Sequence, residues 1–194
     1  HDRFIGVEVD DDLTIRAAIQ MTPSGGLDIF RRDGDDWTLW QAFPAEDMLT
    51  ASTVGFDKMG HVLYLRDSRD RDTAALVAVD IMTGERALLA GHERADADQV
   101  LRHPTERHVQ AVAFDYERKE WQVLDPTIAA DMTFLRGVTD GDAEITSRSL
   151  DDRFWLVAYV VDDGPVRYYL YDRQKQTVDF LFTNRAELEG LPLA

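Results

Sequence analysis

Residues 154–171, FWLVAYVVDDGPVRYYLY, are the stretch that decides how this chain folds. Two runs rich in aromatic and β-branched residues, 154–160 and 166–171, flank the polar turn Asp162-Asp163-Gly164. Such residues favour extended strands, and an Asp-Gly turn between two such runs is typical of a β-hairpin. The stretch therefore predicts two antiparallel strands joined by a tight turn.

Strand-like runs of this kind recur along the whole chain, with turn clusters such as Pro23-Ser24-Gly25-Gly26 and Met82-Thr83-Gly84 between them. The connections are short, so we expect antiparallel meanders. The other predicted strands cover 13–19, 27–32, 37–43, 62–65, 74–80, 86–89, 108–114, 121–124 and 178–182.

Aligning the runs by their turns reveals a repeat, in which a first strand enters a polar turn and two or three hairpin-linked strands follow. The first turns fall at Asp10, Asp57, His103 and Asp151, which are 47, 46 and 48 residues apart. A four-stranded repeat of about 40 to 50 residues is typical of propeller blades, whereas an immunoglobulin-like sandwich would not repeat in this way. We predict an all-β fold, a β-propeller portion of about four antiparallel four-stranded blades, at about 1–45, 46–92, 93–142 and 143–183.

Two segments depart from the repeat. Asp125-Pro126 places a capping carboxylate before a proline at the first helical position, and apolar residues at helical spacing follow up to Gly137. This predicts one short inserted helix over 126–136, after the third strand of the third blade. Residues 184–194 lose strand character and are predicted to form a linker.

The chain carries 21 Lys and Arg against 37 Asp and Glu residues, a net charge of −16, and has no cysteine. An acidic surface repels phosphate backbones and anionic headgroups, so we expect neither a nucleic-acid nor a membrane partner. No run approaches the roughly 18 apolar residues of a membrane span. We expect a soluble protein, cytoplasmic or periplasmic, in which disulfides and cysteine chemistry are excluded.

Residue patterns that support catalysis or cofactor binding are missing. The sequence holds no Gly-x-Ser-x-Gly turn, no Gly-x-x-x-x-Gly-Lys, no Gly-x-Gly-x-x-Gly and no His-Glu-x-x-His. We therefore predict no catalytic residue and no cofactor. We also predict no metal site, because the histidines are not at ligand spacing and the aspartate clusters do not match an EF-hand loop. The histidines are His1, His61, His92, His103 and His108, and the aspartate clusters lie at 10–12, 67–72 and 140–142.

Two aromatic patterns favour packing over chemistry. The stretch RRDGDDW at 31–37 resembles the aspartate-box turn of sialidase-type propellers, although its glycine follows the aspartate directly. We interpret it as a tight hairpin with Trp37 entering a blade interface. Tyr168, Tyr169 and Tyr171 alternate along one strand, so one of its faces is expected to pack in the core.

The last third of the chain resembles a known family. The likeness rests on DPTIAAD at 125–131, SLDDR at 149–153, WLVAY at 155–159, DDGPVRYYLYD at 162–172 and FLFTNR at 180–185. These segments resemble the propeller domain of the prolyl oligopeptidase family of serine peptidases, especially its acylaminoacyl-peptidase and dipeptidyl-peptidase-like branch. The resemblance implies that residues 184–194 lead toward an α/β-hydrolase domain that cleaves short peptides, with the propeller gating access. None of the family's triad positions is present here, so no catalytic residue is carried over.

Two alternatives stay open at this point. A TolB-like propeller would bind a partner protein through one rim, and a sialidase- or lyase-like propeller would need acidic, arginine and tyrosine residues to converge on its axis. Four blades are also fewer than the family's propellers contain. We therefore expect exposed terminal faces near Ile15, Ile19, Phe180 and Phe182, through which the chain forms homo-oligomers.

Overall fold

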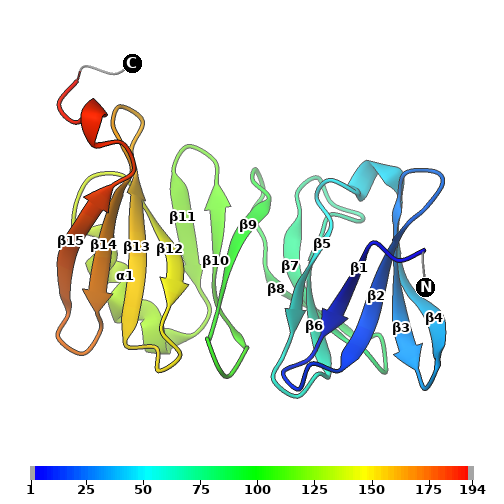
Figure 1. Cartoon of the computed structure of the whole chain (residues 1–194). Helices are drawn as coiled ribbons and strands as arrows, with labels where there is room; N and C mark the ends of the chain where they lie inside the picture. The colour runs from blue at the N-terminus through cyan, green and yellow to red at the C-terminus, as the bar shows by residue number, and fades with distance from the viewer. Residues whose placement is uncertain (1–2, 192–194) are drawn as a thin grey trace.

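The computed structural model describes residues 3–191 and contains fifteen β-strands in four antiparallel sheets (Figure 1). Strands that follow one another in the chain lie side by side, so each sheet is a meander, here called the first to fourth blade. The first blade holds β1 Gly6–Val9, β2 Ile15–Met21, β3 Leu27–Asp33 and β4 Asp36–Phe43, and the second holds β5 Ser52–Phe56, β6 Val62–Asp67, β7 Ala75–Asp80 and β8 Arg86–Ala90. The third holds β9 Ala97–Arg102, β10 Val109–Asp115 and β11 Lys119–Val123, and the fourth holds β12 Asp142–Arg148, β13 Phe154–Val160, β14 Arg167–Asp172 and β15 Thr177–Thr183.

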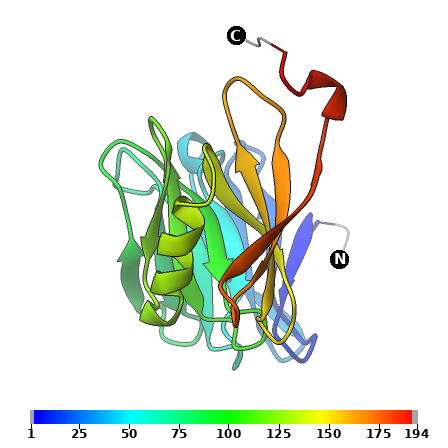
Figure 2. The ribbon, with the colours of Figure 1, turned by 90° about the vertical axis from the view of Figure 1, so that its left-hand side faces the viewer.

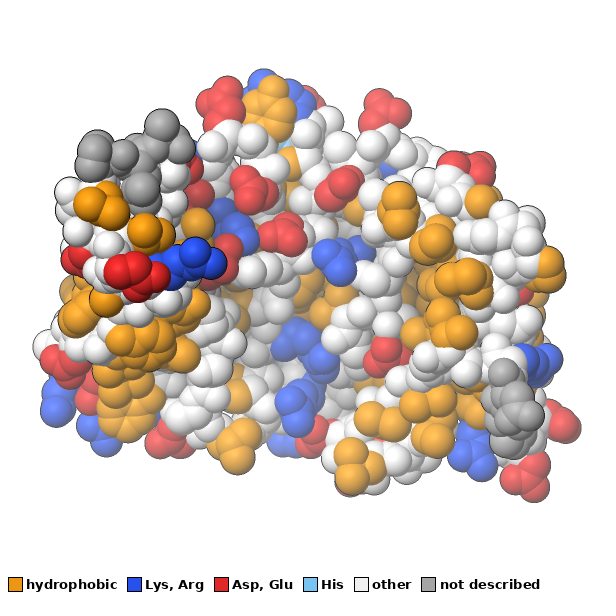
Figure 3. Space-filling view, turned by 45° about the horizontal axis from the view of Figure 1, so that its top comes forward, with side chains coloured by type: hydrophobic (Ala, Val, Ile, Leu, Met, Phe, Trp, Pro, Cys, Tyr) orange, Lys and Arg blue, Asp and Glu red, His pale blue; other side chains and the backbone are white. Residues whose placement is uncertain are grey.

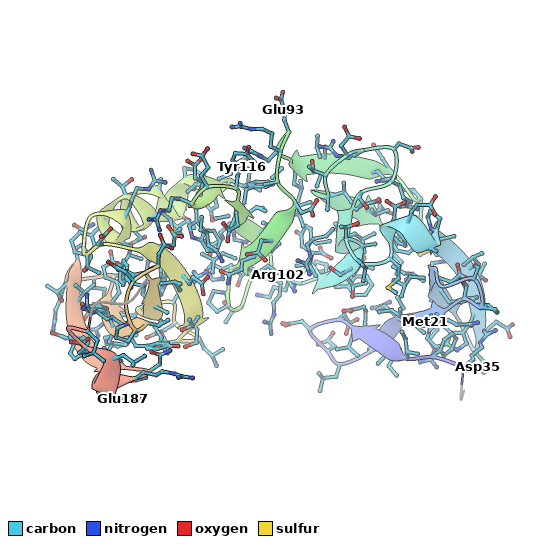
Figure 4. All side chains as sticks on the ribbon, turned by 90° about the horizontal axis from the view of Figure 1, so that it is seen from above. Met21, Asp35, Glu93, Arg102, Tyr116 and Glu187 are labelled. Atoms are coloured by element: carbon cyan, nitrogen blue, oxygen red, sulfur yellow. The ribbon has the colours of Figure 1, made fainter. Side chains whose placement is uncertain are left out.

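Seen from above, the blades stand side by side along an open arc (Figure 4). Asp35 lies at one end of the arc, Glu187 lies at the other, and Arg102 lies on its concave side. Three apolar cores fill the junctions between neighbouring blades, because a sheet that repeats along the chain buries its faces only against its neighbours. Examples are Phe43 against Leu63 in the first junction, Tyr64 against Phe114 in the second, and Leu101 against Trp155 in the third.

The predicted propeller portion is confirmed, with one difference in strand number. The third blade has three strands, whereas the other three blades have four. The predicted helix follows β11 as the 3-10 turn η2 Pro126–Ile128 and the helix α1 Ala129–Arg136, and it lies on the outer side of the sheets (Figure 2). The Asp125 side chain accepts a hydrogen bond from the Thr127 amide and Gly137 ends the helix, as the capping pattern predicted.

The innermost strands β1, β5, β9 and β12 are missing from the strands predicted by residue type. Their sequences, GVEV, STVGF, ADQVLR and DAEITSR, carry small and charged residues where an apolar run would mark a strand. Contacts between β1 and β5 place these two strands side by side at the first junction. The spacing of the first turns predicted these strands better than their composition did.

The two short 3-10 turns outside the third blade connect elements. The turn η1 Ala45–Asp47 follows the first blade, and η3 Ala186–Leu188 lies after the fourth, inside the predicted linker. Residues 192–194 of that linker lie outside the described residues. The linker and the blade boundaries therefore stay predictions. No helix among residues 3–191 has the length and apolar character needed to cross a membrane.

Each end of the arc leaves one sheet face without a neighbouring blade of this chain. On the first blade, this open face carries a cross-strand row across all four strands, Val7, Ala18, Phe30 and Leu39. On the fourth blade the corresponding rows run through β13, β14 and β15 as Ala158, Tyr168, Phe182 and Leu156, Leu170, Asp179. Hydrophobic side chains gather at both ends of the molecule (Figure 3).

The residues expected at these open faces are only partly the right ones. Phe182 lies on the open face of the fourth blade and is 51% exposed. Ile19 pairs with Ile29, which is buried in the junction with the second blade, so it faces inward. Phe180 pairs with Tyr169 on the side that faces the third blade. Register, which the sequence pattern left open, decides which face each side chain occupies.

Candidate functional site

The first turn of each blade begins with a side chain that accepts a hydrogen bond from a backbone amide further along the chain. The Asp10 carboxylate accepts from the Thr14 amide at 2.9 Å, and the Asp57 carboxylate accepts from the Val62 amide at 2.8 Å. His103 Nδ1 accepts from the Glu106 amide at 3.0 Å in the third blade. Each side chain thus satisfies an amide that the tight turn leaves unpaired.

The fourth turn differs from the sequence prediction by two residues. Ser149, and not Asp151, occupies the equivalent position, because its hydroxyl accepts from the Phe154 amide at 3.0 Å. Asp151 accepts from the Ser149 hydroxyl at 2.5 Å instead. Serine and aspartate both accept hydrogen bonds from turn amides, which is why residue type alone selected the wrong one.

A groove of about 260 Å³ lies beside Arg102 on the concave side of the arc, and we call it the axial groove (Figure 4). The ends of β1, β5 and β9 form it together with the first turns of the first and third blades. Three blades therefore contribute to one concave surface. Its lining consists of Glu8, Val9, Asp10, Asp11, Leu13, Val54, Gly55, Phe56, Arg102 and Arg107.

Arg102 joins the second and third blades at this groove. Its guanidinium donates to the Val54 carbonyl at 3.0 Å and to the Phe56 carbonyl, while Nε donates to the Arg107 carbonyl at 2.9 Å. Burial lowers the pKa of Arg102, although the group stays protonated. Gly55 has a φ of +123°, and a Cβ there would lie 2.3 Å from Arg102 Nη1. The glycine therefore makes room for the guanidinium.

Two further contacts cross the groove between blades. Arg107 Nε donates to Asp11 Oδ1 at 2.7 Å, which links the third blade directly to the first. The Thr53 hydroxyl donates to the Glu8 carboxylate, which links the inner strands of the first two blades. Although burial by itself raises the pKa of Asp10, hydrogen bonds from Arg16 and from the Thr14 and Asp12 amides hold that pKa below its usual value. The groove thus carries charges of both signs, each of which is bound to another group of the protein.

A second charged cluster joins the third blade, α1 and the fourth blade. Arg148 occupies the last position of β12, as Arg102 does in β9, and donates to the Arg102 carbonyl at 3.1 Å. Arg148 and Arg173 both pair with Asp152, and Arg173 also pairs with Asp131 at 2.8 Å. These contacts were not predicted. The signal that could have found them is the arginine that directly precedes the first turn in both blades.

The tyrosine in this cluster is held in its neutral form. The Tyr171 hydroxyl donates to Asp131 Oδ1 at 2.7 Å, and the side chain is fully buried. Burial raises the pKa of Tyr171, and the Asp131 carboxylate raises it further. Such a group supplies a structural hydrogen bond and is unsuited to act as a base near neutral pH.

Of the histidines named from the sequence, the structure brings two together. His103 and His108 stack with ring centroids 5.4 Å apart, and His108 Nε2 lies 2.9 Å from Asp125 Oδ2. His61 and His92 lie elsewhere, and His1 is outside the described residues. Within residues 3–191, no group of three or more His, Asp or Glu side chains could hold a metal ion. The absence of catalytic, cofactor and metal residues stays a prediction.

The two aromatic patterns have different outcomes. The stretch at 31–37 forms the β3–β4 hairpin, with Gly34 at a φ of +61°. Trp37 contacts Phe4 at a ring-centroid distance of 5.0 Å on the open face of the first blade, and not in one of the three junctions. Tyr169 and Tyr171 pack into the third junction, as the alternation predicted, whereas Tyr168 stacks on Phe182 at 4.8 Å on the open face.

Comparison with known proteins relates the chain to peptidases. The chain is 43% identical over 192 residues to dipeptidyl aminopeptidase BIII of Pseudoxanthomonas mexicana. This alignment covers 98% of this chain and 28% of that protein. The chain is related to one part of a dipeptidyl aminopeptidase. It is also 27% identical over 202 residues to dipeptidyl peptidase family member 6 of Caenorhabditis elegans, covering 98% of this chain and 27% of that protein. It therefore spans little more than a quarter of the length of these relatives.

Solved structures support the same fold. TolB from Acinetobacter baumannii superposes with a TM-score of 0.58 at 12% sequence identity. The match covers 93% of this chain and 43% of the TolB chain. A putative TolB from Agrobacterium tumefaciens superposes with a TM-score of 0.52 at 16% sequence identity. That match covers 90% of this chain and 63% of the other chain. At such identities the likeness shows the fold alone. No family model matches the chain. The resemblance seen in the sequence is confirmed as a propeller portion related to a peptidase.

Proposed function

We propose that this chain is the non-catalytic propeller portion of a serine peptidase that cleaves short peptides, like the dipeptidyl, acylaminoacyl and prolyl peptidases. The observation that carries the proposal is the 43% identity to dipeptidyl aminopeptidase BIII across 98% of the chain. An α/β-hydrolase domain is the proposed partner in the same protein. The catalytic triad lies on that domain, because this sequence contains no Gly-x-Ser-x-Gly turn.

The proposed role of the blades is steric gating of the active site. Gating needs a surface of fixed shape more than it needs reactive groups. Support comes from the axial groove, where Arg102 is bonded to carbonyls of the second blade and Arg107 is bonded to Asp11 of the first. These bonds hold three blades in a fixed relation around one concave surface. Extended short peptides pass such a surface, whereas folded proteins do not.

The alternatives receive less support from the groove. A carbohydrate-active propeller would need arginine, tyrosine and acidic side chains that are free to contact a sugar. No tyrosine is among the residues that line the axial groove, and both of its arginines are engaged by protein groups. Partner binding of the TolB-like kind rests on likeness of fold alone.

The first test compares this chain with the longer protein that contains it. The isolated chain should neither hydrolyse dipeptidyl or acylaminoacyl coumarin amides nor react with a fluorophosphonate probe, whereas the longer protein should do both. Stoichiometric labelling of any serine in the isolated chain would overturn the non-catalytic assignment. A longer protein that does not react with the probe would overturn the peptidase assignment.

The second test addresses gating separately. In the longer protein, Arg107→Ala removes the bond to Asp11 and should raise hydrolysis of long peptides relative to dipeptidyl substrates. Arg118→Ala, which removes the exposed ion pair with Asp162 at 2.9 Å outside the axial groove, is the matched control. An unchanged ratio of the two rates in Arg107→Ala would contradict gating while leaving the peptidase assignment intact.

A further inference from the structure

The third blade is one strand shorter than its neighbours, which leaves β11 at the edge of its sheet. An edge strand presents unpaired amides and carbonyls to its surroundings. The chain that leaves β11 does not return as a fourth strand but forms η2 and α1. The edge therefore depends on something other than a strand of this chain for pairing.

The register identifies which backbone groups are free. The Leu124 amide donates to the Gln110 carbonyl at 2.8 Å, one step beyond the pair Ala111 and Val123. In an antiparallel ladder, hydrogen-bonded positions alternate, so Gln122 and Glu120 also point toward β10. The amides and carbonyls of Lys119 and Trp121 therefore point outward, and no hydrogen bond within residues 3–191 uses them.

A cavity of about 240 Å³ adjoins this part of the edge. Four consecutive residues of the chain, 118–121, line it. Neighbouring side chains of a strand point to opposite faces, so a cavity lined by all four reaches the edge of the sheet, while Trp121, Ala143 and Ile145 place its inner side at the third junction. Trp121 and the α1 residues Met132 and Leu135 supply an apolar wall, and Gly141, Ala143 and Ile145, at the start of β12, enclose the other side.

The charges around the cavity favour a neutral or basic occupant. Lys119 is held by Asp98 at 3.0 Å and by Glu144 at 2.7 Å, and Arg118 pairs with Asp162. Among residues 3–191, Glu120, Asp142 and Arg136 line the cavity without an ion-pair partner. Two free carboxylates face one guanidinium, on a chain whose net charge is −16.

We propose that the edge of β11 is a β-augmentation site, where a short extended peptide from a separate polypeptide pairs with Lys119 and Trp121 and places an apolar side chain in the cavity. Main-chain hydrogen bonds supply the affinity, and the cavity selects the side chain. A basic residue next to the apolar one meets Glu120 and Asp142. This site is separate from the axial groove, so the inference stands or falls independently of the peptidase proposal.

The test is amide hydrogen exchange by NMR on the 194-residue chain, with the peptide acetyl-Thr-Lys-Leu-Val-Thr-amide. When the free peptide concentration is about nine times the dissociation constant, amide exchange at Lys119 and Trp121 should slow about tenfold, because only the unbound fraction of the protein exchanges at these positions. The Glu120 amide already points toward β10, so its rate should not change. The same peptide with N-methyl groups at alternate positions should lose binding, because it cannot pair with the edge.

Side-chain contributions are tested on both partners. Replacing the peptide lysine by glutamate should weaken binding about two- to five-fold, as for other exposed charge pairs. Glu120→Gln should reduce that preference, whereas Glu187→Gln, an exposed residue far from the cavity, should not. No binding at millimolar peptide, equal binding of the N-methylated peptide, or binding that leaves the exchange of Lys119 and Trp121 unchanged would each overturn the proposal.

Discussion

At Gly55 a single methyl group should disturb the junction between the second and third blades. Its φ is +123°, and a Cβ would lie 2.3 Å from Nη1 of Arg102. Gly55→Ala therefore adds backbone strain of about 1–3 kcal/mol. It also displaces the guanidinium from the Val54 and Phe56 carbonyls, a loss of about 1–2 kcal/mol for a group that water can still reach. The expected decrease in unfolding free energy is about 2–5 kcal/mol.

The chain supplies matched controls for the two parts of this estimate. Gly84 has a φ of +76°, and a Cβ added there would meet no other atom within 4 Å, so Gly84→Ala measures backbone strain alone, about 1–2 kcal/mol. Arg102→Met removes the guanidinium without backbone strain. Once that change is present, Gly55→Ala should cost about 1–2 kcal/mol less than it does in the original chain.

The assay is urea unfolding followed by tryptophan fluorescence and far-UV circular dichroism, on the three single variants and the double variant. Coincident transitions are required before free energies are compared. The reasoning is refuted if Gly55→Ala costs no more than Gly84→Ala. It is also refuted if Gly55→Ala and Arg102→Met are additive, because the methyl group and the guanidinium would then not compete for the same space.

Three further outcomes are expected. Asp67 is fully buried and pairs with Arg69 and Arg86 at 2.6 Å each; burial raises its pKa, but the two arginines and the Arg69 amide hold that pKa below 3.8. The stability that Asp67 contributes is therefore present above about pH 4 and is lost as pH falls through the folded-state pKa. Asp67→Asn should lower the unfolding free energy by about 2–3 kcal/mol at pH 7. It should also make the urea midpoint depend less on pH when midpoints are measured from about pH 7 to 3. Arg107→Ala should cost only about 0.2–1 kcal/mol, since its bond to Asp11 is partly exposed, and the difference from the original chain should shrink in 1 M salt; an equal difference at high salt would show that the loss is not electrostatic. The open faces should drive self-association that sedimentation detects across a concentration series, and Leu170→Asp should weaken it, whereas a strictly monomeric chain at high micromolar concentration would contradict that expectation.

In the sequence, the regularly spaced turn residues predicted the fold better than the composition of the strands did. Asp10, Asp57 and His103 lie at the first turns because tight turns need side chains that accept hydrogen bonds from the backbone, and such residues are visible in sequence. The helix after Asp125 was predictable for the same reason. The innermost strands were not, since burial between blades does not require an apolar run in a short strand.

The charged junctions and the open faces lay beyond what one sequence reveals. Asp131 and Arg173 are 42 residues apart and meet only because α1 packs against the fourth blade. The direction of Ile19 and Phe180 depended on register, and a shift of one residue moves a side chain to the other face. The free edge of β11 became visible only when the third blade proved to lack a fourth strand.

The contact between Asp11 and Arg107 has a consequence for how the chain unfolds. Stability in a repeat array is close to a sum of terms between adjacent units, so cooperative unfolding normally passes from one unit to the next. This contact joins residues 96 positions apart and skips the second blade altogether, which makes the first three blades more nearly one cooperative unit. Both terminal blades have a neighbour on one side only, but the first is also tied to the third by this bond, whereas the fourth contacts the third blade and α1 alone. Under partial denaturation, amides in β13 and β14 should therefore open first, while those in β2, β6 and β10 should open together.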